Sequence, residues 1–396
     1  MKTIDNVNFK DRRAIIRVDF NVPLDEKFNV TDDTRIRAAI PTIQKILSDG
    51  GSAVLMSHLG RPKGGYEEKF SLKHIVTTVE KLLSVPVKFA SDSVGDNVKN
   101  LALELKAGEV LLLENLRFHK QETTGTESFA QELASLGDIY VNDAFGTAHR
   151  AHASTTIIAK FFPKNKCFGY VMAGELVSIH KVLTSAEKPF TAIMGGAKVS
   201  GKILIIEKLL DKIDNLLIGG GMAYTFIKAQ GGKIGSSLVE EDKIDIALKI
   251  LSDAKAKSVN IYIPVDTIAG DGFSNDAKKQ ICDIHKIPDG WIGLDIGPAT
   301  ENIYKNIILK SKTILWNGPM GVFEMSSFEH GTQAVALAVA EATGKGSYTL
   351  IGGGDSVAAI NKYKLADKVS YVSTGGGALL KYIESGTLPG VEAIEK

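Results

Sequence analysis

The sequence predicts an α/β protein made of two doubly wound parallel-sheet (Rossmann-like) domains, joined by a helix and with a cleft between them. Short β-branched runs alternate with longer amphipathic stretches along almost the whole chain, a pattern typical of parallel sheets covered by helices on both faces. At 396 residues the chain is also too long for one ordinary core. Pro163 and Pro189 bracket a segment, Gly174–Thr184, that has the composition of a single connecting helix.

Each element follows from its own apolar spacing. In the first half we expect strands at Ala14–Phe20, Ser52–His58, Glu109–Leu116 and Ile139–Asn142, and helices at Arg35–Leu47, Leu72–Leu83 and Ser128–Leu136. In the second half we expect strands at Phe190–Met194, Asn215–Ile218, Asn260–Val265, Thr313–Trp316 and Ser347–Ile351, and helices at Ile203–Ile213, Lys243–Ala256, Ala299–Leu309 and Gln333–Ala342.

These elements predict a first domain of residues 1–172, an interdomain helix at 173–185 and a second domain at 186–384. The segment Leu388–Val391 follows the last helix and contains a Pro-Gly pair, so residues 385–396 are expected to return to the first domain.

Composition excludes several classes of protein. An apolar content of 44% with 23% charged residues is that of a globular chain. A net charge of +1 argues against a nucleic-acid partner, which calls for a basic stripe. Cys167 and Cys282 cannot make a disulfide framework, and no apolar run reaches the roughly 18 residues that span a bilayer. We therefore expect a soluble, cytoplasmic protein without a membrane partner.

Arginine and glycine divide the chain between them. All eight arginines lie at or before Arg150, whereas the triplets Gly219–Gly221, Gly352–Gly354 and Gly375–Gly377 all lie in the second half. The guanidinium fork grips carboxylate and phosphate with two parallel hydrogen bonds. One half is thus predicted to hold a compact anion by side chains, and the other to bring bare backbone against a phosphate chain. Arg12, Arg13 and Arg37 also fit ordinary surface charges.

Polar residues follow the first predicted strand. Asp19 and Asn21 lie before Pro23 at a spacing of two, so they share one face and offer a carboxylate and an amide to a hydroxyl-bearing ligand. A simple turn cap explains the pair equally well. The run Thr31–Thr34 is expected to cap a helix, which places Arg35 in its first turn beside free amide donors.

Three further motifs follow predicted strands directly and combine arginine with histidine. They are Ser57-His58-Leu59-Gly60-Arg61-Pro62, Asn115-Leu116-Arg117-Phe118-His119, and the run from Asn142 to His152 that contains His149 and Arg150. The spacing of His149 and His152 would permit metal ligation, but no third ligand supports it. Together with Arg35, the arginines of these motifs (Arg61, Arg117 and Arg150) make four. Charge-assisted bonds contribute roughly 1.5–3 kcal/mol each, so four arginines suffice to hold a small phosphorylated acid.

The second half contains a near match to a phosphate loop. From Gly196 to Lys202 the spacing is GxxxxGK, but the next residue is Ile203, where that loop needs a hydroxyl for Mg²⁺. Glycines and a helix start can still approach phosphate, with Lys198 and Lys202 one turn apart as point charges. Asp355, directly after a glycine triplet, is the preferred Mg²⁺ ligand. No triplet sits in a GxGxxG frame, so a dinucleotide fold is disfavoured.

Over nearly its whole length the chain resembles the phosphoglycerate kinase family. The resemblance rests on the joint order of RVDFNVPLD, SHLGRP, LLENLRFH, VNDAFGTAHRAH, GGAKVSGK, GGGMAYTF, GLDIGP, WNGPMGVFE, GGGDS and STGGGA. The family's aspartate–threonine pair is Asp355-Ser356 in this chain, which keeps a hydroxyl. The resemblance implies a phosphotransferase with a carboxyl acceptor that moves a phosphoryl group between 1,3-bisphosphoglycerate and ADP, in glycolysis and gluconeogenesis. It also implies ATP or ADP as co-substrate, Mg²⁺ and a monomer.

The resemblance further assigns site residues to matching positions. The 3-phosphoglycerate site would comprise Asp19, Asn21, Arg35, His58, Leu59, Gly60, Arg61, Arg117 and Arg150. The nucleotide site would comprise Lys202, Gly293, Glu324, Gly353, Gly354, Asp355 and Ser356, with Asp355 on the metal. Arg35, Lys198 and Gly376 would be the catalytic positions.

Two other functions compete with this one. A phosphate-loop ATPase would need Ser or Thr in place of Ile203. A non-catalytic nucleotide-binding scaffold would need neither the arginine set nor Lys198. An acyl phosphate donor and a carboxylate nucleophile require no general base, which agrees with the absence of an obvious acid–base pair in the sequence.

Overall fold

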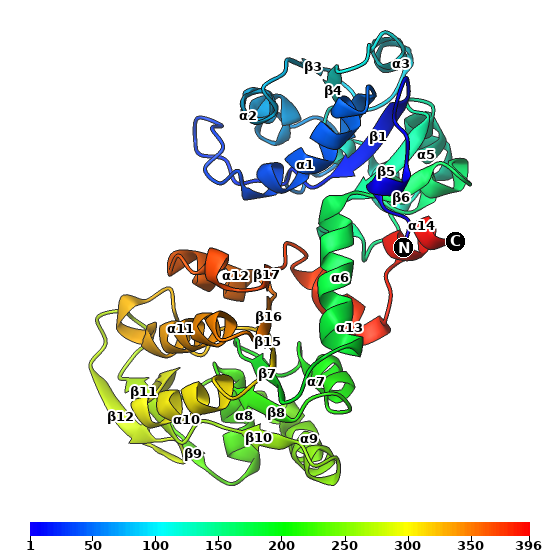
Figure 1. The fold of residues 1–396 in the computed structure, drawn as a ribbon. Helices are drawn as coiled ribbons and strands as arrows, with labels where there is room; N and C mark the ends of the chain where they lie inside the picture. The colour runs from blue at the N-terminus through cyan, green and yellow to red at the C-terminus, as the bar shows by residue number, and fades with distance from the viewer. The chain divides into compact units, whose positions relative to one another are not determined.

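The computed structural model describes all 396 residues and confirms the α/β class (Figure 1). The chain forms two compact units, one of Met1–Val177 with Ser385–Lys396 and one of Ser178–Glu384. Each contains a six-stranded, all-parallel sheet. The division between the units falls within α6 (Tyr170–Thr184).

The first unit is built on a sheet with strand order β3-β4-β2-β1-β5-β6. Its strands are β1 (Arg13–Val18), β2 (Ser52–Met56), β3 (Val87–Phe89), β4 (Val110–Leu112), β5 (Ile139–Asp143) and β6 (Lys166–Phe168). Its helices are α1 (Thr34–Ser48), α2 (Val76–Leu83), α3 (Asp96–Leu103), α4 (Lys120–Thr124), α5 (Glu127–Ala134) and α14 (Pro389–Glu395).

Both faces of this sheet are covered. Ile16 and Val18 on β1 pack in one buried cluster with Ile40 and Ile43 of α1. Ile15 and Arg17, which point to the opposite face, are also fully buried. A strand that is buried on both faces loses the polar–apolar alternation of an exposed sheet, which is why these strands appear in the sequence as continuous apolar runs.

The second unit has the strand order β10-β8-β7-β15-β16-β17. Its strands are β7 (Phe190–Met194), β8 (Asn215–Ile218), β10 (Asn260–Tyr262), β15 (Thr313–Asn317), β16 (Tyr348–Ile351) and β17 (Tyr371–Val372). Its helices are α7 (Ile203–Leu209), α8 (Met222–Ala229), α9 (Ile244–Ala256), α10 (Pro298–Ile308), α11 (His330–Gly344), α12 (Gly354–Lys362) and α13 (Gly377–Ser385).

Two small sheets were not predicted for the second half, and only one of them departs from the parallel arrangement. β11 (Asp266–Gly270) pairs antiparallel with both β12 (Lys279–Asp283) and β14 (Ile292–Ile296), whereas β9 (Lys233–Ile234) pairs parallel with β13 (Lys286–Ile287). β12 is largely exposed and polar, so it carries little of the apolar pattern on which the sequence prediction depended.

The order of strands places a topological switch point in each unit. In the second unit β7 lies between β8 and β15, so the strand order reverses on the two sides of β7. In the first unit β1 lies between β2 and β5. Ligands of open α/β sheets bind beyond the carboxyl ends of the strands at such points. The loops that follow β1, β2, β4 and β5, and those that follow β7, β8, β15 and β16, are therefore the places to look for a site.

Candidate functional site

An anion pocket at the carboxyl edge of the first unit

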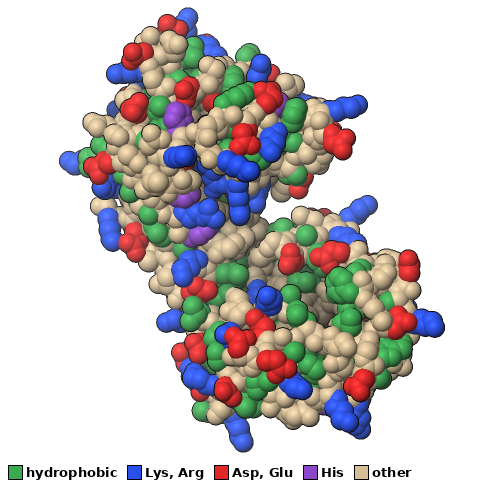
Figure 2. All heavy atoms as spheres, turned by 180° about the vertical axis from the view of Figure 1, so that it is seen from behind, with side chains coloured by type: hydrophobic (Ala, Val, Ile, Leu, Met, Phe, Trp, Pro, Cys, Tyr) green, Lys and Arg blue, Asp and Glu red, His purple; other side chains and the backbone are tan.

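Basic side chains gather where β1, β2, β4 and β5 end. Burial lowers the pKa of His58 well below its ordinary value, and the charges of Arg17, Arg117 and Arg35 lower it further, so these cations surround one imidazole. Figure 2 shows Lys and Arg side chains beside His side chains on this unit. The charges with the largest effect on this imidazole are all positive, and a concentration of positive charge is suited to an anionic ligand.

Arg17 supports this pocket from below. It is fully buried on β1, where Nη2 lies 3.1 Å from Nδ1 of His58 and Nε donates to Oγ of Ser154 at 2.8 Å. Ser154 Oγ in turn donates to the buried Glu122 at 2.6 Å. A buried charge needs such partners to be tolerated. Arg17 and Glu122 are therefore linked through Ser154, and this buried network holds the floor of the pocket in place beneath the more exposed arginines.

Asp19, Asn21 and Arg35 form a second connected group. Arg35 Nη1 lies 3.2 Å from Asp19 Oδ2 and donates to the backbone oxygen of Asn21 at 3.1 Å. The Asn21 side chain accepts from the backbone N–H of Gly60 at 2.8 Å, which joins the loops after β1 and β2. At the start of α1, Asp32 accepts from the N–H of Thr34, whereas the N-cap residue Asp33 makes no capping hydrogen bond. The turn-cap interpretation of Asp19 applies only in part, since its carboxylate accepts from the Asn21 N–H at 3.3 Å while also meeting Arg35.

Several buried nitrogen atoms in this pocket make no hydrogen bond. Nε of Arg117, Nδ1 of His149 and Nδ1 of His152 make no hydrogen bond in the structure. Burial lowers the pKa of His152 to about 4, with Arg117, Arg17 and Arg150 adding to the effect. Unsatisfied buried polar atoms are rare in native proteins and call for an explanation. A bound anion would supply the missing acceptors for Arg117 and raise the low pKa of the histidine.

Two residues assigned by resemblance, Leu59 and Arg61, are placed differently from the rest, and the pair His149 and His152 lacks the further ligands of a metal site. The side chain of Leu59 belongs to the hydrophobic core, so only its backbone is available to a ligand. Arg61 is exposed and is not among the cations that act on His58. His149 and His152 do not form a metal site, because no group of three or more His, Cys, Asp or Glu side chains is arranged to hold a metal ion.

Glycine loops and a pocket in the second unit

The loops at the topological switch point of the second unit are rich in glycine and pack closely against one another. Gly195 N–H donates to Asn317 O at 3.0 Å, and a Cβ on Gly195 would lie 2.1 Å from the oxygen of Pro319. Gly353 adopts φ 91°, and a Cβ there would meet Asn317 Nδ2 at 2.4 Å. Only glycine allows these loops to lie so close together. The triplets are thus required by packing between loops as well as by any approach of phosphate.

Beside these loops lies a pocket of about 740 Å³. Gly196, Gly293, Glu324 and Asp355, which come from four separate segments, all line it. Gly293 is in contact with the ring of Tyr224, since a Cβ there would lie 2.0 Å from the tyrosine oxygen. Mostly apolar walls with a few polar groups are typical of pockets for small-molecule ligands.

Two lysines flank the pocket in different environments. Burial lowers the pKa of Lys202 to about 8, while the charge of Asp355 acts in the opposite direction. Lys198 is exposed on the loop after β7. That loop is held by Glu240, which accepts from the N–H of Ser200 at 3.0 Å and from its hydroxyl at 2.6 Å.

Ser356 does not face the pocket. It is fully buried, and its Oγ accepts from the N–H of Gly318 at 2.5 Å. The hydroxyl that the chain keeps after Asp355 therefore links the loops after β15 and β16, and only the backbone of Ser356 is available to a ligand.

Sequence reasoning missed the residues that hold the candidate site groups in place. These are Arg17, Glu122, Ser154, Glu240 and Asn317. The partners are 137 residues apart for Arg17 and Ser154 and 40 apart for Glu240 and Ser200, so no local pattern reveals them. The position of Arg17 inside an otherwise apolar strand was the one available signal.

Comparison with known proteins

The chain is similar to one family along almost its entire length. The family model described as phosphoglycerate kinase matches residues 4–386. Among curated relatives, a phosphoglycerate kinase of Porphyromonas gingivalis is 54% identical over 417 residues, covering 99% of this chain and 100% of the relative. A cytosolic phosphoglycerate kinase of Nicotiana tabacum is 52% identical over 393 residues, covering 99% and 98%.

Solved structures give the same result. The phosphoglycerate kinase of Coxiella burnetii superposes with a TM-score of 0.90 at 40% identity, covering 99% of this chain and 98% of that one. The enzyme of Pyrococcus horikoshii OT3 has a TM-score of 0.85 at 30% identity, covering 100% and 98%. No helix of the structure combines the length and the apolar content needed to cross a bilayer.

Proposed function

The chain belongs to the phosphoglycerate kinase family, and from that premise we propose how its residues carry out the reaction. The enzyme catalyses reversible phosphoryl transfer between the acyl phosphate of 1,3-bisphosphoglycerate and ADP, giving 3-phosphoglycerate and ATP, as a step of glycolysis. We infer that the first unit binds the phosphoglycerate and the second the nucleotide.

The buried, unpartnered Nε of Arg117 is the single observation that most supports the phosphoglycerate site. Together with Arg35 and Arg150 it would grip the phosphate and carboxylate, which guanidinium groups bind in a bidentate manner. Asp19 and Asn21 would take the ligand hydroxyl. The backbone from His58 to Arg61 would complete the wall, with Arg61 contributing only if its exposed side chain turns inward.

The nucleotide would lie in the pocket of the second unit. Its base would rest against Gly293, its ribose hydroxyls would meet Glu324, and its phosphates would reach Lys202 and the backbone from Gly353 to Ser356. These positions line or adjoin one pocket of about 740 Å³. The residues present also fit Mg²⁺, because Asp355 offers one exposed carboxylate and this ion commonly takes one or two carboxylates beside phosphates and water. When bound, the ion would neutralise phosphate charge.

Catalysis in this arrangement depends on position and charge. The acceptor carboxylate is already a nucleophile, so neither direction needs a general base. His58 is poorly suited to that role, since Nδ1 faces the Arg17 guanidinium. Arg35, Lys198 and the backbone of Gly376, which has φ 50°, would neutralise the transferring phosphoryl group, whose charge is spread over its oxygens. We also propose a cytoplasmic location, because two relatives are named cytosolic, and a monomer, as the family resemblance implies.

A coupled assay of ATP formation from 1,3-bisphosphoglycerate and Mg-ADP tests the proposal. The family reaction gives ATP in proportion to the acyl phosphate consumed. A phosphate-loop ATPase would instead hydrolyse ATP without the acyl phosphate, and a scaffold would bind ADP without turnover. Either of these last two outcomes would overturn the assignment.

A further inference from the structure

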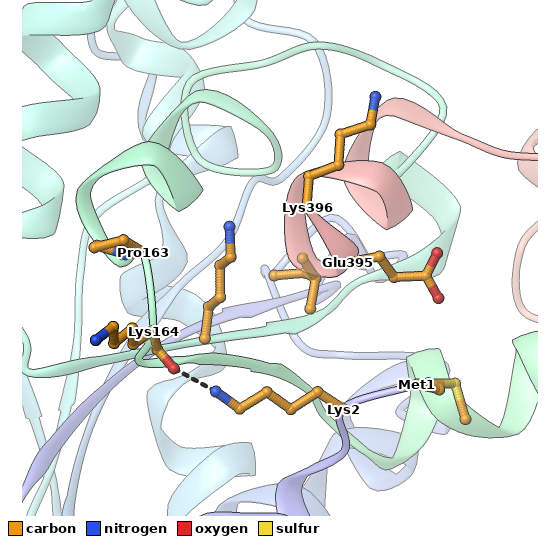
Figure 3. A pocket seen from close by; sticks show the side chains of 8 residues that line it. Met1, Lys2, Pro163, Lys164, Glu395 and Lys396 are labelled. Carbon is orange, nitrogen blue, oxygen red and sulfur yellow. Dashed lines mark hydrogen bonds between the residues drawn. The ribbon is translucent and has the colours of Figure 1, made fainter.

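A second cationic pocket lies in the first unit, away from the arginine cluster. It has a volume of about 360 Å³ and is bounded by the segment Met1–Lys2, the loop that enters β6, and α14 (Figure 3). Lys166 is the first residue of β6. The pocket is therefore at the amino end of this strand, whereas the arginine cluster lies beyond the carboxyl ends of the strands. Neither the family reaction nor the site described above uses it.

Three segments that are far apart in sequence build this pocket. The backbone oxygen of Lys2 accepts from the N–H of Phe168 at 3.0 Å, which fixes the Met1–Lys2 segment along β6. The ammonium of Lys2 donates to the backbone oxygen of Lys164, as Figure 3 shows. On the other side, α14 is anchored by the N–H of Gly390, which donates to Ala148 O at 2.9 Å. The walls are thus held by hydrogen bonds before any ligand arrives.

The charges in the pocket are not balanced. Among the side chains, four lysines line it, Lys2, Lys164, Lys166 and Lys396, against one carboxylate, that of Glu395. Lys396 is paired elsewhere, with Glu392 at 2.7 Å. Glu395 forms no ion pair with any of these lysines, so its charge is not directly engaged.

Lys166 is the central group. The residue as a whole is only 9% exposed, its ammonium still reaches solvent in the pocket, and it makes no hydrogen bond and no ion pair in the structure. Burial lowers its pKa, and the charge of Lys2 lowers it further. An ammonium that has lost part of its hydration and has no acidic partner gains from an anionic ligand, which supplies the missing opposite charge.

We propose that this pocket binds a multivalent phosphate anion, such as the diphosphate or triphosphate group of a small molecule, through Lys166, Lys2 and Lys164. Lysine is a point-charge donor that suits phosphate oxygens without demanding planar geometry. Three ammonium groups around one cavity favour a multiply charged anion over a single carboxylate. Inorganic pyrophosphate is the simplest probe of this chemistry, and ADP tests whether a nucleotide can supply the same group.

Calorimetry of the full chain with pyrophosphate at low salt tests the proposal. Lys166→Met removes the ammonium and keeps the aliphatic stem. The matched control is Lys160→Met, which alters an exposed lysine that pairs with Glu127 at 2.9 Å outside the pocket. Arg117→Met removes a cation of the other cluster. In Lys166→Met, the affinity of one pyrophosphate site should fall by about tenfold or more, the loss expected for a charge-assisted bond. The same site should keep its affinity in Lys160→Met and in Arg117→Met. Equal affinity in Lys166→Met and Lys160→Met, or loss only in Arg117→Met, would overturn the proposal.

Chemical protection keeps the proposal testable if Lys166→Met fails to fold. The unmodified protein is acetylated with an amine-reactive ester, and modification at each lysine is followed by mass spectrometry. Pyrophosphate should slow acetylation of Lys166 severalfold and leave Lys160 unchanged. If ADP protects Lys166 as well, a nucleotide is a source of the anion; if only pyrophosphate does, the ligand is a free oligophosphate. Absence of protection by both probes contradicts the site.

Discussion

Nη2 of Arg17 lies 3.1 Å from Nδ1 of His58, and both side chains are almost completely buried. A guanidinium can only donate, so Nδ1 is the acceptor and the ring carries its proton on Nε2. Burial, followed by the charge of Arg17, lowers the pKa of His58, so this histidine stays neutral at physiological pH. The pocket therefore combines permanent arginine charges with imidazoles that do not titrate in the working range.

Acid should lower the stability of the fold through His152, another buried histidine of this pocket. His152 has a pKa of about 4 in the folded chain against an ordinary 6.5, because burial and the neighbouring arginines outweigh Glu122, whose Oε1 is 3.8 Å from its Nδ1. Between these two values the unfolded chain binds more protons, so the free energy of unfolding falls as the pH decreases from about 6.5 towards 4. His152→Asn should reduce that fall, measured by urea unfolding at pH 7.5 and 4.5. The exposed His285→Asn is the control, and equal pH dependence in both variants would contradict the prediction.

The affinity for 3-phosphoglycerate should depend on the forked shape of the Arg117 guanidinium as well as on its charge. Arg117→Lys keeps a cation but cannot form two parallel bonds, and we expect 3-phosphoglycerate affinity to fall by about tenfold or more. ADP affinity should hardly change, because the nucleotide pocket belongs to the other unit. Calorimetry with each ligand measures both effects, and Arg37→Lys, which alters an exposed arginine paired with Asp33, is the control. Equal losses for the two ligands would refute the division of roles between the units.

How far the sequence predicted this site depends on the range of the interactions. The strands Phe190–Met194 and Asn215–Ile218 have the bounds that their apolar runs predicted, because burial on both faces leaves a local pattern. The antiparallel β11, β12 and β14 were missed: β12 is exposed and carries little of that pattern, whereas β11 and β14 are mostly buried but short and interrupted by glycine or aspartate. The arginines and glycines that follow the strands were visible, whereas Arg17–Ser154 and Glu240–Ser200 depend on chain segments that meet only in the fold.

Glu240 should position the Lys198 loop. Both of its carboxylate oxygens accept from Ser200, two residues beyond Lys198. Glu240→Ala removes both bonds and should lower kcat by about tenfold, because small misplacements of a catalytic group are costly. The KM for 3-phosphoglycerate should stay unchanged, since that site is assigned to the other unit. Steady-state kinetics of Glu240→Ala and of the neighbouring exposed Glu241→Ala provide the comparison. Indistinguishable kcat values would show that the loop holds its position without Glu240.

Asp355 should set the requirement for Mg²⁺. Asp355→Asn keeps the size of the side chain and removes the charge, so more Mg²⁺ should be needed for half-maximal activity, while phosphoglycerate affinity stays constant. A Mg²⁺ titration at fixed ADP measures this. Asp367→Asn, a change in a second exposed aspartate of the same unit, is the control. A titration curve that matches that of the control would remove Asp355 from the metal site.

Lys202 should make nucleotide binding depend on pH in the alkaline range. Burial lowers its pKa to about 8 in the free protein, and only the protonated form attracts phosphate. Bound phosphate raises that pKa again, so binding near pH 8 takes up a proton. ADP affinity should be constant below about pH 7.5 and fall above pH 8 by up to about tenfold per pH unit. Calorimetry in buffers with different ionisation enthalpies measures the proton uptake directly. Lys202→Arg keeps its charge at these pH values, so it should bind ADP with nearly constant affinity and no uptake. The exposed Lys208→Arg in α7 should behave like the unmodified chain, and an unchanged pH profile in Lys202→Arg would assign the titration to another group.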